Sequence, residues 1–135
     1  MTPPTELYGT RPLLDKLGVR VDTHVALVGV FENDFVDLLR DRTQFVDEGV
    51  PQEAVNMILL AADSLDDLAL LAGLRQRIVP DGAVWVVSRK GKQATIRDTD
   101  VIAASLDAGL VDNKVVSFSD THTALRAVIR LRDRK

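Results

Sequence analysis

The 135-residue sequence predicts an α/β protein, a three-layer α/β/α sandwich with a Rossmann-like, mostly parallel sheet and a C-terminal antiparallel hairpin strand. Three observations predict this fold class. Apolar runs typical of strands buried on both faces alternate with helical segments. The last two strand-like segments are joined by only a few residues, which favours an antiparallel hairpin. The length is sufficient to bury a core without disulfide bonds or metal ions.

The strands are predicted from runs of apolar residues. Three runs contain almost no polar side chains and are expected to be central strands: residues 24–30 (HVALVGV), 54–63 (AVNMILLAAD) and 83–88 (AVWVVS). A short strand is expected within TQFVDE, residues 43–48. Another is expected near 114–118, and it forms the terminal hairpin with TALRAVIRLR across the SDTH link.

The first two helices are predicted from short amphipathic segments with suitable ends. In RPLLDKLG, Pro12 suits the first turn of a helix and Gly18 suits its end. In FVDLLRD the apolar residues share one face at helical spacing. Asn33 or Asp34 is expected to cap this second helix.

The third helix has the clearest signals in the sequence. It is expected over residues 64–78, because Ser64 is followed three residues later by Asp67 in a variant capping box. Its acidic start and basic end suit the helix dipole. The fourth helix is TDVIAASLDAG, which we expect to end at Gly109.

Composition and charge exclude several function classes. The formal net charge of −3 provides no global basic field for nucleic acid or anionic lipid. The absence of cysteine excludes disulfides, thiolate nucleophiles and cysteine metal sites, and the two histidines, His24 and His122, are too far apart to suggest a metal centre. MTPPTELYGTRP lacks the apolar core of a signal peptide, and no apolar run reaches membrane-spanning length. We therefore expect a cytoplasmic protein without a membrane partner.

Two sets of residues carry a resemblance to known families. RIVPDGAVWVV and the terminal hairpin resemble a shortened class I S-adenosylmethionine methyltransferase. TRPLLDKLGV, HVALVGV, DGAVWVVSRKG and GLVDNKVVSFSDTHTALRAVIR resemble an uncharacterised bacterial family of short methyltransferase-like domains. This resemblance implies one methyltransferase-like α/β domain over residues 1–135, irregular over 1–10. It implies no reaction, because that family has no assigned activity.

The bend after the first predicted strand weighs against a cofactor. It contains only Gly29, where the resemblance implies two or three glycines that let the cofactor approach the backbone. Phe31 is expected to fill the groove, and Glu32 would repel the cofactor's carboxylate. The sequence therefore predicts a non-catalytic binding or assembly module without a cofactor, and it leans against an enzyme.

The alternative is a divergent S-adenosylmethionine-dependent methyltransferase. Asp47 and Glu48 end a predicted strand, where an acidic side chain can bind ribose hydroxyls. Asp63 ends another strand, where it can contact a ligand or help to cap the next helix. With Gly29 and Phe31, these residues form the expected cofactor-binding set.

A second alternative is a protein that binds a small anion or nucleotide. Arg89, Lys90 and Lys92 form a basic turn after the strand AVWVVS, and cations at a strand end can hold an anion. RKGKQ does not match the phosphate-binding pattern GxxxxGK[ST]. A solvated loop is the simpler interpretation.

The remaining candidates concern partners and catalysis. Basic residues alternate with apolar ones near the C-terminus, but sparse aromatic residues argue against nucleic acid. Trp85 is expected in the core or at a subunit interface, so a homodimer or a protein partner is open. His122 lies near Ser117 and Ser119, but no GxSxG pattern supports a catalytic triad.

Overall fold

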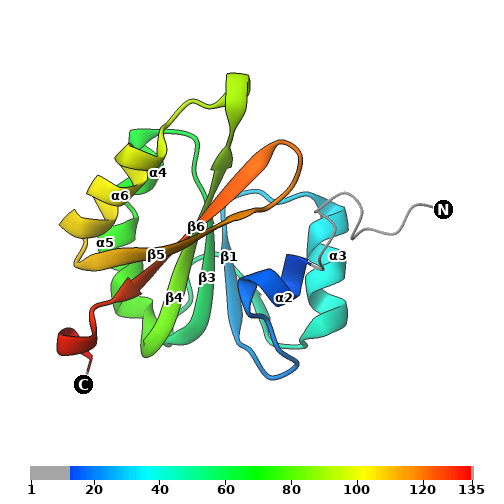
Figure 1. Cartoon of the computed structure of the whole chain (residues 1–135). Coiled ribbons are helices and arrows are strands. Elements are labelled where there is room, and N and C mark those ends of the chain that lie inside the picture. The colour runs from blue at the N-terminus through cyan, green and yellow to red at the C-terminus, as the bar shows by residue number, and fades with distance from the viewer. Residues whose placement is uncertain (1–12, 135) are drawn as a thin grey trace.

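The computed structural model describes residues 13–134, which form a six-stranded mixed sheet flanked by helices (Figure 1). The segment 1–10, expected to be irregular, lies outside the described residues. The strands are β1 (Val25–Val28), β2 (Val46–Glu48), β3 (Val55–Ala61), β4 (Ile78–Arg89), β5 (Leu110–Ser117) and β6 (His122–Ile129). The helices are α2 (Leu13–Leu17), α3 (Asn33–Arg42), α4 (Leu65–Leu68), α5 (Leu71–Leu74) and α6 (Asp98–Asp107). Short 3₁₀ turns cover Arg75–Arg77, Gly91–Gln93 and Leu131–Asp133.

The strand order is β2-β1-β3-β4-β6-β5. The first four of these strands run parallel, and β6 lies antiparallel between β4 and β5. This arrangement confirms the predicted α/β fold class and the C-terminal hairpin. It also brings the β5–β6 turn to the edge of the sheet where β4 ends, because Arg89 pairs with His122.

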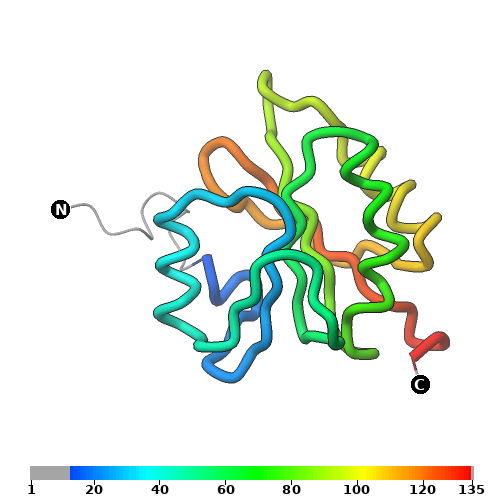
Figure 2. The backbone as a smooth tube through the Cα atoms, turned by 180° about the vertical axis from the view of Figure 1, so that it is seen from behind, coloured from blue at the N-terminus to red at the C-terminus, as the bar shows by residue number. Residues whose placement is uncertain are grey.

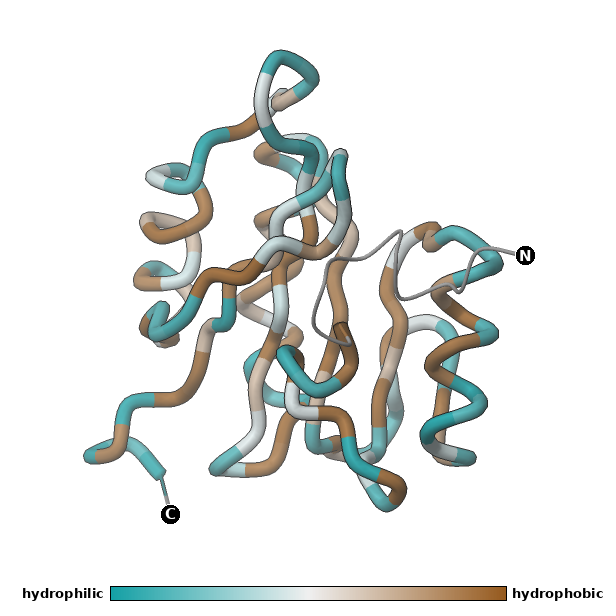
Figure 3. Tube along the Cα trace, turned by 45° about the vertical axis from the view of Figure 1, so that its right-hand side comes forward, coloured by the Kyte–Doolittle hydropathy of each residue, from teal (hydrophilic) through white to brown (hydrophobic). Residues whose placement is uncertain are grey.

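Helices cover both faces of the sheet (Figures 1 and 2). Side chains alternate between the two faces along each strand, as the pleat requires. On β4, Val84 and Val86 join the core on the α4–α6 side, whereas Trp85 and Val87 join the core beneath α2 and α3. Hydrophobic residues follow the strands, and hydrophilic residues concentrate in the connections (Figure 3).

Trp85 belongs to the core. Its side chain is fully buried, and its indole Nε1 donates a hydrogen bond of 3.2 Å to the carbonyl of Leu17 at the end of α2. This bond satisfies the polar atom of an otherwise apolar side chain. It also fixes α2 against β4. No helix within residues 13–134 has the length and hydrophobicity needed to cross a bilayer.

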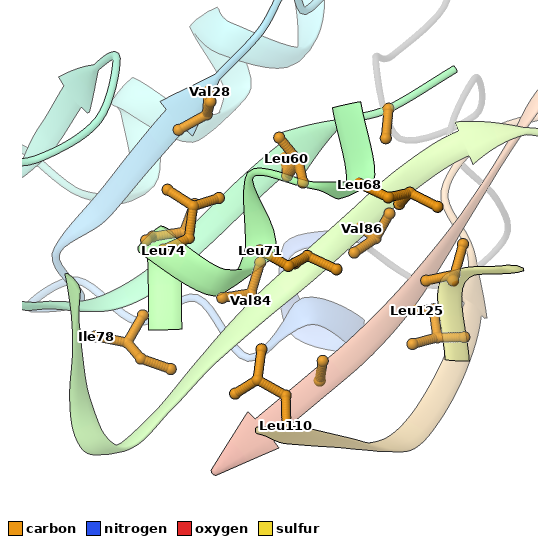
Figure 4. Close-up of a cluster of buried hydrophobic side chains, with 14 of the residues drawn as sticks. Val28, Leu60, Leu68, Leu71, Leu74, Ile78, Val84, Val86, Leu110 and Leu125 are labelled. Atoms are coloured by element: carbon orange, nitrogen blue, oxygen red, sulfur yellow. The ribbon is translucent and has the colours of Figure 1, made fainter. Parts of the chain in front are cut away.

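The helix expected over residues 64–78 is interrupted, which corrects that prediction. Its buried leucines, Leu68, Leu71 and Leu74, repeat every three residues (Figure 4). An α-helix turns them progressively off one face, whereas the tighter 3₁₀ spacing keeps them aligned. The backbone accordingly tightens between α4 and α5, where the amide of residue 70 bonds the carbonyl of residue 67.

The predicted cap of the second helix lies one residue earlier. Asn33 and Asp34 fall inside the first turn of α3, and the residue before them, Glu32, caps the helix without a side-chain hydrogen bond. The apolar pattern does not locate helix ends to a single residue. Residues 80–82 (PDG) lie within β4, where the pairing with β3 shifts register.

Candidate functional site

A pocket of about 330 Å³ opens at the carboxyl ends of the parallel strands. We call it the carboxyl-edge pocket. It is lined by Val30, Phe31, Glu32, Ala61, Asp63, Val87, Arg89, Phe118, Ser119 and His122. Since β2 and β3 lie on opposite sides of β1, the ends of β1 and β3 mark the topological switch point of the sheet. Open α/β sheets bind their ligands at such points.

Gly29 makes the bend after β1, and a side chain at this position would point toward β3. Its φ is +101°, a value that L side chains rarely adopt. A Cβ at this position would lie 2.9 Å from the Cβ of Ala61 and 3.2 Å from the Ala61 carbonyl oxygen. Contact with β3 is therefore sufficient reason for glycine here, and Gly29 is not among the residues that line the carboxyl-edge pocket.

Phe31 forms one wall of the carboxyl-edge pocket. Its ring centroid lies 5.7 Å from that of Phe35 on α3 and 6.4 Å from that of Phe118 at the hairpin. Phe35 and Phe118 are themselves 4.8 Å apart, at an angle typical of packed aromatic rings. This packing holds the Phe31 ring to the side. Phe31 therefore does not close the carboxyl-edge pocket, which is open beside the ring.

Opposite charges meet across the ends of β3 and β4. The Nε of Arg89 lies 3.8 Å from Oδ1 of Asp63, and both side chains are about half exposed. An exposed ion pair at this distance contributes little to stability. Asp63 and Arg89 can therefore separate and each bind a ligand instead. Asp63 belongs to the predicted cofactor set and Arg89 to the predicted anion set, whereas the structure brings them together.

The backbone on both sides of Asp63 is fixed by other residues. Its amide donates to Oδ2 of Asp67 at 2.9 Å, and its carbonyl accepts from the hydroxyl of Thr95 at 2.5 Å. Ser64 caps α4, since its Oγ accepts from the amide of Asp67 at 3.1 Å. The predicted Ser64 cap is confirmed. The carboxylate of Asp63 does not serve as that cap, and it lines the pocket instead.

The hairpin brings His122 and Ser119 into the pocket. Nδ1 of His122 lies 2.7 Å from the Thr121 hydroxyl, and its amide donates to Oγ of Ser119 at 3.1 Å. In the sequence His122 stands near serines without a triad pattern, so its place in this pocket is not predicted. The available signal was topological: an antiparallel strand placed beside β4 must begin where β4 ends.

The other predicted site residues lie apart from the carboxyl-edge pocket. Asp47 and Glu48 line a separate hollow of about 500 Å³, and Oε1 of Glu48 is 4.0 Å from Nη2 of Arg40. Nζ of Lys90 donates to Oγ of Ser117 at 2.8 Å. Lys92 is exposed in the turn that follows. The structure therefore places only part of each predicted set at the carboxyl-edge pocket: Phe31 and Asp63 of the cofactor set, and Arg89 of the anion set.

Comparison with known proteins identifies the fold. No family model and no curated protein matches this sequence. A SAM-dependent methyltransferase from Aquifex aeolicus matches with a TM-score of 0.63 at 14% identity, over 93% of this chain and 92% of its own. A TehB-like SAM-dependent methyltransferase from Corynebacterium glutamicum matches with a TM-score of 0.55 at 11% identity, over 87% and 85%.

A longer enzyme matches over part of its length. It is the O-methyltransferase NcsB1 from neocarzinostatin biosynthesis, solved with S-adenosyl-L-homocysteine and 1,4-dihydroxy-2-naphthoic acid. Its TM-score is 0.60 at 14% identity, over 80% of this chain and 49% of NcsB1. The chain thus spans about half of that enzyme. At these identities the matches establish a fold shared with SAM-dependent methyltransferases.

These findings correct the functional prediction. The expected non-catalytic binding or assembly module is wrong, since the structural neighbours are SAM-dependent methyltransferases. Of the three features behind that expectation, the structure bears on Phe31, whose ring packs against Phe35 and Phe118. The single glycine of the bend and the charge of Glu32 are as the sequence gives them.

Proposed function

We propose that this chain is a divergent S-adenosylmethionine-dependent methyltransferase that binds its cofactor in the carboxyl-edge pocket. The observation that carries the proposal is the position of the Asp63–Arg89 pair beside the switch point of a methyltransferase-like sheet, next to an aromatic wall. The resemblance of the terminal hairpin and of RIVPDGAVWVV to class I methyltransferases supports the same function.

The residues of the pocket fit the chemistry of this cofactor. S-adenosylmethionine carries two positive centres, an ammonium and a sulfonium, which the carboxylates of Asp63 and Glu32 can neutralise. Its own carboxylate suits the guanidinium of Arg89. The rings of Phe31 and Phe118 offer an apolar surface. The pocket volume of about 330 Å³ is at the lower end of the range of ligand sites.

The other residues of the predicted cofactor set keep roles in the proposal. Asp47 and Glu48 line a hollow of their own, so they are the proposed ribose acceptors of a cofactor that extends from the carboxyl-edge pocket toward β2. The strand β2 pairs directly with β1 and ends at the same edge of the sheet. Gly29 contributes by shaping the bend, because its contact with Ala61 fixes the direction in which the chain leaves β1. Neither role requires the two or three glycines that the resemblance to methyltransferases implies after the first strand.

When bound, S-adenosylmethionine supplies an electrophilic methyl group. This chain would bind and orient an acceptor beside it. His122 is the group in the pocket best suited to take a proton from an acceptor hydroxyl or amine, because an imidazole can do so through one nitrogen while the other is held. Its Nδ1 is held by Thr121, which directs that role to Nε2.

The proposal extends to the cellular setting. We assign the chain to the short bacterial methyltransferase-like family, as a single domain in the cytoplasm, on the GLVDNKV segment and the hairpin sequence. A homodimer or a protein partner is part of this proposal. A nucleic-acid partner is not, because the net charge is −3.

Isothermal titration calorimetry tests the proposal with S-adenosylmethionine and S-adenosylhomocysteine. Asp63→Asn keeps the shape of the side chain and removes its charge, so binding of S-adenosylmethionine should weaken by about 10-fold or more. Lys92→Gln, a charge change on the neighbouring exposed turn, is the control and should bind as the wild type does. No heat from the wild-type protein at millimolar ligand would reject the proposal.

A further inference from the structure

A second hollow lies at the opposite edge of the sheet, where the parallel strands begin. Its volume is about 730 Å³. It is surrounded by the end of α2, the first residues of β3, the part of β4 that follows its register shift, and the β5–β6 pair. We call it the amino-edge basin. It shares no lining residue with the carboxyl-edge pocket, so an inference about it is independent of the proposed methyltransferase function.

Arg126 is the unusual residue of the amino-edge basin. Its neighbours on β6, Leu125 and Ala127, are buried in the core on the α4–α6 side. The alternation of the strand therefore turns Arg126 to the other face, opposite Trp85 of β4 and Lys114 of β5. Arg126 is half-buried there, at the side of the basin.

The charge of Arg126 is not compensated. Among residues 13–134 its side chain makes no hydrogen bond and no ion pair. Burial lowers the pKa of Arg126, and the positive charge of Arg134 lowers it further. Withdrawing an ionised group from water without a partner costs free energy. A ligand that supplies the missing negative charge would recover this cost.

Further cations surround the basin. Lys114 reaches across to α2, where its Nζ donates to the carbonyl of Lys16 at 3.3 Å. Lys16 and Arg20 add two more positive charges to the lining. The lining also contains three carboxylates, those of Asp15, Asp22 and Asp81. Asp15 is engaged at 3.1 Å by Arg42, which does not line this basin.

We propose that the amino-edge basin binds a small phosphate-bearing molecule, with Arg126 as its anchor and Lys114 as a second cation. A guanidinium matches the oxygens of a phosphate with two parallel hydrogen bonds, and an ammonium adds a mobile charge beside it. The volume of about 730 Å³ exceeds that of a bare phosphate and suits a ligand of the size that typical binding pockets hold. A sugar phosphate or a nucleotide has this combination of charge and size.

Calorimetry with inorganic phosphate, pyrophosphate and adenosine diphosphate tests this site in the chain of residues 1–135. Arg126→Gln should weaken binding of pyrophosphate by about 10-fold or more, and Lys114→Gln should weaken it less. Arg132→Gln is the matched control, because Arg132 is exposed and does not line the basin. An equal loss in the Arg132 variant, or no heat from any of the three probes at millimolar concentration, would overturn the proposal.

A measurement on the unmodified protein keeps the test decisive if a variant fails to fold. Amide resonances should shift on addition of pyrophosphate at the end of α2 and around Lys114 and Arg126. Shifts confined to the turn that contains Lys90 and Lys92 would show that the anion binds elsewhere, and the basin would be rejected as its site. The absence of S-adenosylmethionine binding would not affect either result.

Discussion

Substitution of Gly29 by alanine tests how the bend after β1 is constrained. The added methyl group would lie 2.9 Å from the Cβ of Ala61, closer than carbon atoms pack, and the backbone would keep a φ of +101°. Overpacking costs about 1–3 kcal/mol. A left-handed backbone at a non-glycine residue costs about 1–2 kcal/mol more. Gly29→Ala should therefore reduce the free energy of unfolding by about 2–5 kcal/mol.

Urea denaturation followed by tryptophan fluorescence provides the assay. The chain has one tryptophan, Trp85, and it is fully buried, so its emission reports unfolding. Gly49→Ala is the matched control: Gly49 has a φ of +91°, but no atom lies within 4 Å of its added Cβ. Gly49→Ala should therefore lower the free energy of unfolding only by the cost of the left-handed backbone, about 1–2 kcal/mol.

A double-mutant cycle isolates the contact with β3. Ala61→Gly removes the carbon that the new methyl group would meet, so it should offset part of the cost of Gly29→Ala. The reasoning is refuted if Gly29→Ala costs no more than Gly49→Ala. It is also refuted if the Ala61→Gly background gives no relief.

Three further predictions concern stability. Ser64→Ala should cost about 1 kcal/mol because it removes the cap of α4, and a denaturation midpoint equal to the wild type would contradict that role. Trp85→Phe should lower the free energy of unfolding by about 1–3 kcal/mol, because it leaves the Leu17 carbonyl without its donor. This variant has no tryptophan, so circular dichroism must follow its unfolding. An unchanged midpoint would contradict the contribution of that bond. Arg126→Leu should leave stability unchanged or raise it, because it removes an uncompensated half-buried charge, whereas a lower melting temperature would show that Arg126 has a stabilising partner.

The strands could be predicted because burial on both faces leaves a simple pattern. The run 83–88 has no charged residue, and every residue in it is buried in β4. The break between α4 and α5 was harder to predict. The same leucines suit an α-helix or a tighter helix, and packing against β3 and β4 decides between them.

The candidate site could be predicted where it depends on strand ends alone. Asp63 follows a clear strand, and the carboxyl ends of parallel strands share one edge of a sheet. The positions of Phe31 and His122 depend on contacts between distant segments. Phe31 needs Phe118 to hold its ring aside, and His122 needs the pairing of β6 with β4 to reach the pocket. Neither contact leaves a local signal.

A crystal structure of this protein with S-adenosylhomocysteine is the most direct test of the central claim, that the carboxyl-edge pocket holds the cofactor. We predict density for the ligand between the Phe31 wall and the Asp63–Arg89 pair, with the ligand's carboxylate on Arg89. Density in the amino-edge basin instead, or a ligand-free pocket in crystals grown at saturating concentration, would contradict it.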